Sequence, residues 1–129
     1  MPLIKVDLIK GREPEEIKQI LDVAHQVVLE AFHVPEGDRY QVVTQHEPYE
    51  MIMKDTGLGF ERSDNVILFT VISTQRTDKM KKDFYQLLTE RLEQYCQIDP
   101  RDVMITFVTN GAGEWSFGFG KAQFLTGDL

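Results

Sequence analysis

Two stretches of the chain carry apolar residues at helical spacing, and this pattern limits the possible folds most. The first stretch begins near Pro14 and ends near Phe32, and the second runs from about Thr77 to Tyr95. In both, apolar side chains recur every three or four residues, which gathers them on one face of an α-helix. Two long amphipathic helices exclude an all-β fold, so the protease-like triplet at 55–57 is interpreted as a turn.

Strand patterns flank both helices. Residues 4–8 alternate between apolar and charged, as expected of a strand with one buried face, and further strands are predicted at 39–45 and 103–109. Residues 66–72 are apolar except for Thr70, which is typical of a central strand covered on both faces. A short extended segment is predicted at 50–54, and a hairpin or short strand after Glu114.

The same order of elements occurs twice, 64 residues apart. The shift superimposes apolar positions on apolar positions, and it also superimposes Arg12 on Arg76 and Asp38 on Asp102. We therefore predict an α+β, two-layer fold in a single domain, 1–129, built from two βαβ units at about 2–64 and 65–129. The two units share one mixed sheet with both helices on one face. The other face has no helix to cover it, so we expect a homo-oligomer.

Charge and cysteine content narrow the function. Twenty-one acidic against fourteen basic residues give a net charge of −7, the wrong sign for binding a phosphate backbone. No apolar run approaches the ~20 residues of a membrane span. The single Cys96 excludes a disulfide within the chain, and the N-terminus does not resemble a secretory signal. We expect a cytoplasmic protein that acts on or binds a small molecule, without nucleic acid or membrane partners.

Four features could carry chemistry. Removal of Met1 would leave Pro2 with a secondary amine that could act as base, acid or Schiff-base nucleophile, although many proteins begin with Met-Pro. Asp38 precedes a strand and could orient a water or a carbonyl, or merely close a turn. Arg12 and Arg76 each follow a strand and could bind a carboxylate in a bidentate pair. The aromatic residues of the tail suit a pocket wall, a subunit contact or core packing; they are Trp115, Phe117, Phe119 and Phe124.

Metal and dinucleotide sites are not expected. The three histidines share no ligand spacing with one another or with Cys96. The Gly-x-Gly pairs at 111–113 and 118–120 lack the following helix that a dinucleotide site requires. We therefore expect no cofactor and no metal.

Met1-Pro2, the repeated βαβ unit and Lys10-Gly11-Arg12 together resemble the tautomerase superfamily. Within it, the chain is most similar to the malonate semialdehyde decarboxylase-like subgroup, and the resemblance spans nearly the whole chain. The segments that carry it are 2–5, 38–41, 55–59, 115–118 and 124–128, which read PLIK, DRYQ, DTGLG, WSFG and FLTGD.

The resemblance implies a homotrimer and an N-terminal proline, here Pro2, as the catalytic group with Asp38 as its partner. In the decarboxylase, two arginines two residues apart bind the substrate carboxylate. Arg76 matches the second, but Thr74 stands in place of the first and supplies neither a guanidinium nor a charge. The resemblance also implies a hydrophobic wall made of Trp115, Phe117 and Phe124, with Leu129 contributing.

The expected function is a cofactor-independent enzyme acting on a small anionic oxo acid, with decarboxylation of a 3-oxo acid ranked first. The same groups could serve a keto–enol tautomerase or a hydratase. A trimeric small-ligand-binding protein without catalysis is the alternative from another class.

Overall fold

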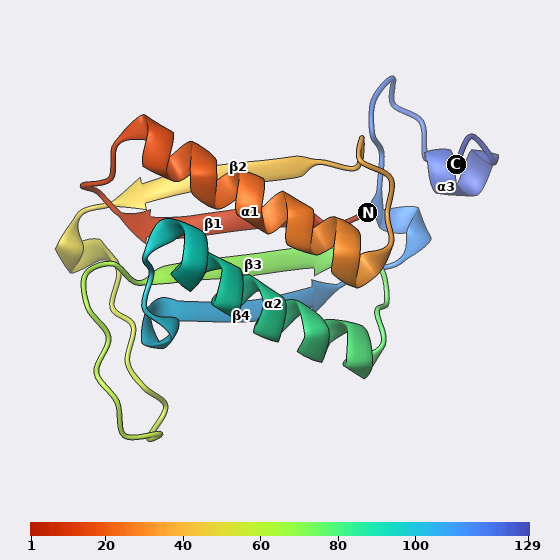
Figure 1. Ribbon diagram of the computed structural model, residues 1–129. Helices are drawn as coiled ribbons and strands as arrows, with labels where there is room; N and C mark the ends of the chain where they lie inside the picture. The colour runs from red at the N-terminus through yellow and green to blue at the C-terminus, as the bar shows by residue number, and fades with distance from the viewer.

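Four strands form one mixed sheet in the computed structural model, which describes residues 1–129 (Figure 1). β1 (Leu3–Ile9) and β3 (Ile67–Ser73) lie antiparallel at the centre. β2 (Tyr40–His46) runs parallel to β1 on one edge, and β4 (Val103–Thr109) runs parallel to β3 on the other. The order β2-β1-β3-β4 confirms the two βαβ units in one sheet.

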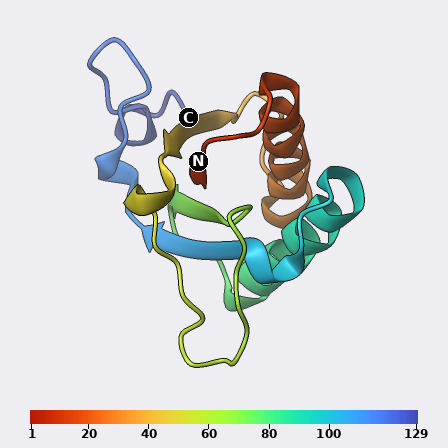
Figure 2. The same cartoon turned by 90° about the vertical axis from the view of Figure 1, so that its left-hand side faces the viewer.

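Both long helices lie on the same face of this sheet, as predicted, and Figure 2 shows them on one side. α1 (Pro14–Phe32) begins with a proline in its first turn, where the missing N–H is not needed. α2 (Asp78–Cys96) is capped by Thr77, whose side chain accepts a hydrogen bond from the backbone N–H of Met80. Neither helix is apolar enough over a sufficient length to cross a membrane.

The core lies between the helices and one face of the sheet. Alternate residues of the two central strands are at most 2% exposed and pack against both helices; they are Ile4, Val6, Leu8, Ile67, Phe69 and Val71. On the opposite face, Val42 and Val108 are about half exposed, at 51% and 50%. The central position of β3 is confirmed, but within the single chain only one of its faces is covered: Leu68, Thr70 and Ile72 are half-buried, because no helix packs on that side.

The 64-residue repeat extends beyond the strands and helices. Each long helix ends in a left-handed residue, His33 or Gln97, both at φ 55°. Two 3-10 turns, Pro48–Glu50 and Ala112–Glu114, also occupy equivalent positions. The two halves therefore share local geometry as well as element order.

Two local predictions were wrong. Residues 51–54 form no strand, because the 3-10 turn at Pro48 takes the chain off the sheet edge into an arm, residues 47–66. The tail contains one antiparallel bridge, Gly118–Lys121, and a short helix α3 (Gln123–Thr126) instead of a regular hairpin.

A buried histidine on α1 remains without a hydrogen bond. His25 is 4% exposed, and its Nε2 atom has no partner. A buried polar atom without a hydrogen-bond partner destabilises the fold, so the burial of the His25 ring costs folding free energy.

Candidate active site

Strand register brings the N-terminus to the same end of the sheet as the start of β2 and the end of β3. Leu3 pairs with Tyr40 on one side and with Ile72 on the other. The residues just outside these pairs are Pro2, Asp38–Arg39 and Ser73–Thr74. Three segments that are far apart in sequence therefore converge where β1 begins.

At the N-terminus, Pro2 is buried at this end of the sheet. The Pro2 side chain is less than 2% exposed. Burial lowers the pKa of the Met1 amine below its usual value, the positive charge of Arg76 lowers the pKa further, and the Asp38 carboxylate raises it. The strand register brings the three groups to one end of the sheet, and the charges of Arg76 and Asp38 act on the amine there.

Asp38 offers a buried carboxylate that the rest of the chain does not use. It is 9% exposed, and its backbone N–H donates to the carbonyl oxygen of Pro35 at 3.0 Å. No side chain or backbone group donates to its carboxylate oxygens. Because a buried carboxylate needs donors, these oxygens are available to a water or a ligand.

The guanidinium of Arg76 is hydrogen-bonded through Nε, and its two terminal nitrogens have no partner. Its Nε donates to the Ser73 hydroxyl at 3.0 Å, and its guanidinium lies over the Phe32 ring at 5.3 Å. Burial lowers the pKa of Arg76, and the Asp38 carboxylate opposes that shift. Its two terminal nitrogens remain unpaired, which suits a substrate carboxylate.

Thr74 adds no second cation to this group. It is half-buried, and its carbonyl oxygen accepts a hydrogen bond from the Ser73 hydroxyl at 2.9 Å. Arg39, at the same end of the sheet, is paired with Asp22, so Arg76 is the guanidinium left for a ligand.

Three of the four aromatic residues of the tail form one cluster beside β2, and the fourth, Phe119, is 99% exposed and lies outside it. Trp115 stacks on Phe117 at 5.3 Å, and Phe124 meets Phe117 edge-on at 5.4 Å. Tyr40, at the start of β2, stacks on the other side of Phe117 at 5.8 Å. Leu129 lies outside the stack and is 62% exposed.

Four residues that support these groups were not predicted from the sequence. Ser73 and Phe32 hold Arg76, and Tyr40 joins the aromatic stack to β2. Asn110 accepts a hydrogen bond from the Trp115 ring at 2.8 Å and donates its backbone N–H to Ser73. Ser73 and Asn110 could have been predicted, because each lies at the end of a predicted strand. Phe32 and Tyr40 could not, because their ring contacts are with residues far away in the sequence.

The other candidate groups lie elsewhere. Asp55 accepts backbone hydrogen bonds from Gly57, Gly59 and Phe60 and so forms a turn. Burial raises the pKa of the Cys96 thiol, and nearby Arg12 only partly offsets this. No three His, Cys, Asp or Glu side chains lie close enough to hold a metal ion. None of the three clefts of the single chain includes Pro2, Asp38 or Arg76.

Sequence comparisons agree with this geometry. Two family models, both described as tautomerase enzyme, match residues 38–118 and 2–61. The chain is 51% identical to the probable tautomerase YrdN of Bacillus subtilis (strain 168) over the full length of both. It is 31% identical to the probable tautomerase YusQ of the same strain, covering 97% of this chain and 99% of that protein.

Solved structures give close matches as well. Wild-type, mutant and inactivated malonate semialdehyde decarboxylase matches at 53% identity and a TM-score of 0.96, covering 98% of both chains. The FG41 malonate semialdehyde decarboxylase inhibited by 3-bromopropiolate matches at 38% identity and a TM-score of 0.94, covering 98% of this chain and 97% of that one. A symmetric trimer of fused 4-OT shares the fold, at 16% identity and a TM-score of 0.78, covering 97% and 98%.

Proposed function

The chain belongs to the tautomerase family of enzymes, and from that premise we propose that it is a cofactor-independent decarboxylase of a small 3-oxo acid such as malonate semialdehyde. The observation that carries the proposal is the convergence of a buried amine position, a buried carboxylate and a half-free guanidinium at one end of the sheet. Decarboxylation needs each of these three groups.

Removal of Met1 would place the free amine at Pro2, deeper than the amine of Met1. As an ammonium, Pro2 donates an N–H to the 3-oxo oxygen of the substrate while Arg76 holds the carboxylate. The bond between the carboxylate carbon and C2 then breaks, and its electron pair moves to C2 to form an enolate that Pro2 stabilises. Carbon dioxide leaves, and a proton adds to C2. Asp38 orients a water or the carbonyl during this step.

The surroundings of Pro2, Asp38 and Arg76 favour conversion of the charged substrate carboxylate into neutral carbon dioxide. Pro2 and Asp38 are buried, and Arg76 packs over the Phe32 ring, so water screens the three groups weakly. The aromatic stack of Trp115 and Phe117 adds an apolar wall. A charged carboxylate that becomes neutral carbon dioxide gains from such a site.

Relatives support the choice of substrate class. The 53% identical structures are of a decarboxylase described with decarboxylase and hydratase activities, and they include a variant in which its first residue, a proline, is replaced by alanine. The FG41 match at 38% identity is also a malonate semialdehyde decarboxylase.

A tautomerase is the second candidate, because Thr74 leaves one guanidinium and the two Bacillus relatives are named probable tautomerases. In that reaction the Pro2 amine takes a proton from carbon and returns it to oxygen. A hydratase would instead use Asp38 to activate water. A non-catalytic binding protein is less favoured, since both family models are described as enzymes.

We further propose a homotrimer in the cytoplasm. The open sheet face exposes Val42 and Val108, which water alone would cover in a single chain. A fused 4-OT of the same fold is described as a symmetric trimer. A neighbouring copy would also enclose the Pro2 end of the sheet, which no cleft of the single chain includes.

The role of Pro2 is tested by N-terminal mass spectrometry and a Pro2→Ala variant. We expect Met1 to be absent and the variant to lose activity on malonate semialdehyde by about 10²-fold or more, because a positioned acid–base group contributes at least that much. Pro14→Ala, which changes a proline far from the site, is the matched control. Retention of Met1, or unchanged turnover in Pro2→Ala, contradicts the proposal.

The choice between decarboxylase and tautomerase is tested by Thr74→Arg. A second guanidinium next to Arg76 should raise the rate of decarboxylation while leaving the keto–enol tautomerisation of phenylpyruvate nearly unchanged. Gln75→Arg adds the same charge at an exposed position and should change neither rate. An active phenylpyruvate tautomerase that does not decarboxylate malonate semialdehyde, with or without Thr74→Arg, favours the second candidate.

A further inference from the structure

The repeat places a second arginine–aspartate pair at the opposite end of the sheet. Arg12 is equivalent to Arg76, and Asp102 is equivalent to Asp38. The local geometry is also repeated: the backbone N–H of Asp102 donates to Asp99 at 2.8 Å, as that of Asp38 donates to Pro35 at 3.0 Å.

This second end has no amine. The position equivalent to Pro2 is Val66, which lies inside the chain and presents only a peptide bond. Chemistry that depends on a free amine is therefore excluded there, and any role is limited to binding.

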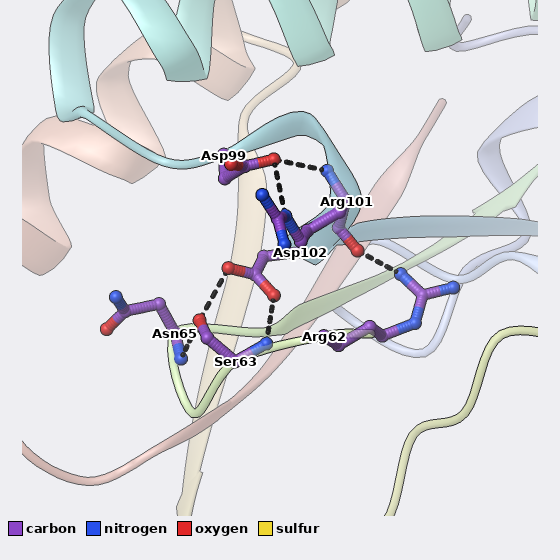
Figure 3. Close-up of polar contacts among 6 residues, drawn as sticks. All are labelled: Arg62, Ser63, Asn65, Asp99, Arg101 and Asp102. Carbon is purple, nitrogen blue, oxygen red and sulfur yellow. Dashed lines mark hydrogen bonds and ion pairs between the residues drawn. The ribbon is translucent and has the colours of Figure 1, made fainter. Parts of the chain in front are cut away.

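In the second pair, the carboxylate of Asp102 is already hydrogen-bonded to the arm. Asp102 is 2% exposed, and it accepts hydrogen bonds from the backbone N–H and the hydroxyl of Ser63 at 2.7 and 2.6 Å (Figure 3). The Ser63 hydroxyl in turn accepts from the backbone N–H of Asn65 at 3.1 Å. Both carboxylate oxygens of Asp102 are therefore hydrogen-bonded, whereas those of Asp38 are not. Asp102 holds the arm and is not available to a ligand.

Arg12 stays available. It is half-buried and donates one hydrogen bond, from Nη2 to the carbonyl oxygen of Asn65 at 2.7 Å. Burial lowers the pKa of Arg12, and the charges of Glu16 and Asp102 oppose that shift. Like Arg76, it is anchored through one part of the guanidinium and keeps other N–H groups free.

The free part of Arg12 lines a cleft of about 370 Å³ between the β1–α1 loop and the end of α2. Polar and charged side chains dominate this cleft; they include Lys10, Arg12, Glu16, Asp64, Asn65 and Gln97. Lys10 is already paired with Glu47, so Arg12 is the cation free to meet an anion. Glu16 and Asp64 would repel a second negative charge on a ligand.

We propose that this cleft is a second, non-catalytic site that binds a small monocarboxylate through Arg12. The site uses the guanidinium that the repeat preserves, and it lacks the amine and the free carboxylate of the Pro2 end. It does not depend on the reaction proposed for Pro2.

The test is a titration of the full chain with pyruvate, a stable monocarboxylate, followed by amide chemical shifts. We expect saturable shifts at Gly11 and Gln97, which line the cleft. Arg12→Gln should weaken this binding about tenfold or more, as loss of a charge-assisted hydrogen bond does. Arg76→Gln, the equivalent change at the other end of the sheet, should leave the shifts at Gly11 and Gln97 intact.

A second variant guards against misfolding of Arg12→Gln. Gln97→Glu changes an exposed side chain and puts a competing carboxylate beside Arg12, so it should also weaken binding at Gly11. The proposal is overturned if Gly11 and Gln97 do not respond to pyruvate, or if folded Arg12→Gln or Gln97→Glu binds as the wild type does.

Discussion

At the scale of single residues, the N-terminal amine is subject to opposing charges. Burial and Arg76 lower the pKa of the Met1 amine, and Asp38 raises it. We expect shifts in the same directions for the Pro2 amine that removal of Met1 would leave. An ammonium acid loses activity as the pH rises through this pKa, whereas a free-amine base gains activity there. The two flanking charges therefore set the pH range in which each of the two candidate reactions can run.

We predict that Arg76→Gln raises the pKa of this amine, because it removes a nearby positive charge, and that Asp38→Asn lowers it further. The measurement is an NMR titration of the chain labelled with ¹⁵N-proline, which does not require activity. Arg39→Gln is the control, since Arg39 is paired with Asp22 and should leave the pKa unchanged. Equal amine pKa values in the wild type and Arg76→Gln would refute the electrostatic coupling.

At the scale of elements, the arm depends on one buried carboxylate. Asp102 precedes β4 and accepts two hydrogen bonds from Ser63, and Arg62 donates to the carbonyl oxygen of Arg101 (Figure 3). Within the arm, Arg62 also donates to the carbonyl oxygen of Lys54. The arm contains no strand, and its only regular element is one 3-10 turn. These side-chain contacts, and not a sheet ladder, tie it to the rest of the fold.

We predict that Asp102→Ala lowers the free energy of unfolding by about 1–3 kcal/mol, because it removes the buried carboxylate that accepts two hydrogen bonds from Ser63. Urea denaturation measures this loss, and hydrogen exchange at the Ser63 amide should accelerate. Asp64→Ala, an exposed neighbour, is expected to change stability by less than about 0.5 kcal/mol. A loss no larger than that of the control would show that the arm is held by other contacts.

The sequence pattern predicted the boundaries of the helices and strands well, but it did not predict the conformations of the arm and the tail. Helical spacing and alternation fall on α1, α2 and the four strands within a residue or two. Residues 50–54 and the segment after Glu114 have no such pattern. Their conformations depend on side-chain hydrogen bonds that hydrophobic periodicity does not reveal. Those of Asp55 and Asn110 are local, and that of Asp102 joins it to Ser63, 39 residues away.

At the scale of the whole molecule, one face of the sheet remains open. Val42 on β2 and Val108 on β4 are half exposed there, while the helices cover the other face and bury the two central strands. In the proposed trimer, a neighbouring copy of the chain covers this face.

We predict that the wild type sediments as a trimer and that Val42→Asp shifts it toward the single chain, because a carboxylate would be buried without a partner at the interface. Sedimentation velocity measures the change. Gln26→Asp, on the exposed side of α1, should leave the assembly unchanged. A wild type that sediments as a single chain, or a trimeric Val42→Asp, would refute this assignment of the interface.

The sequence alone determined the elements, the 64-residue repeat and the placing of both helices on one face, because periodicity and capping act over a few residues. It also pointed to Pro2, Asp38 and Arg76, since each lies just before or just after a strand. Only the tertiary structure decided which of two equivalent pairs is open to a ligand. Asp38 is left without a donor, and Asp102 is filled by Ser63. That difference depends on contacts across 39 residues of chain, which no local pattern contains.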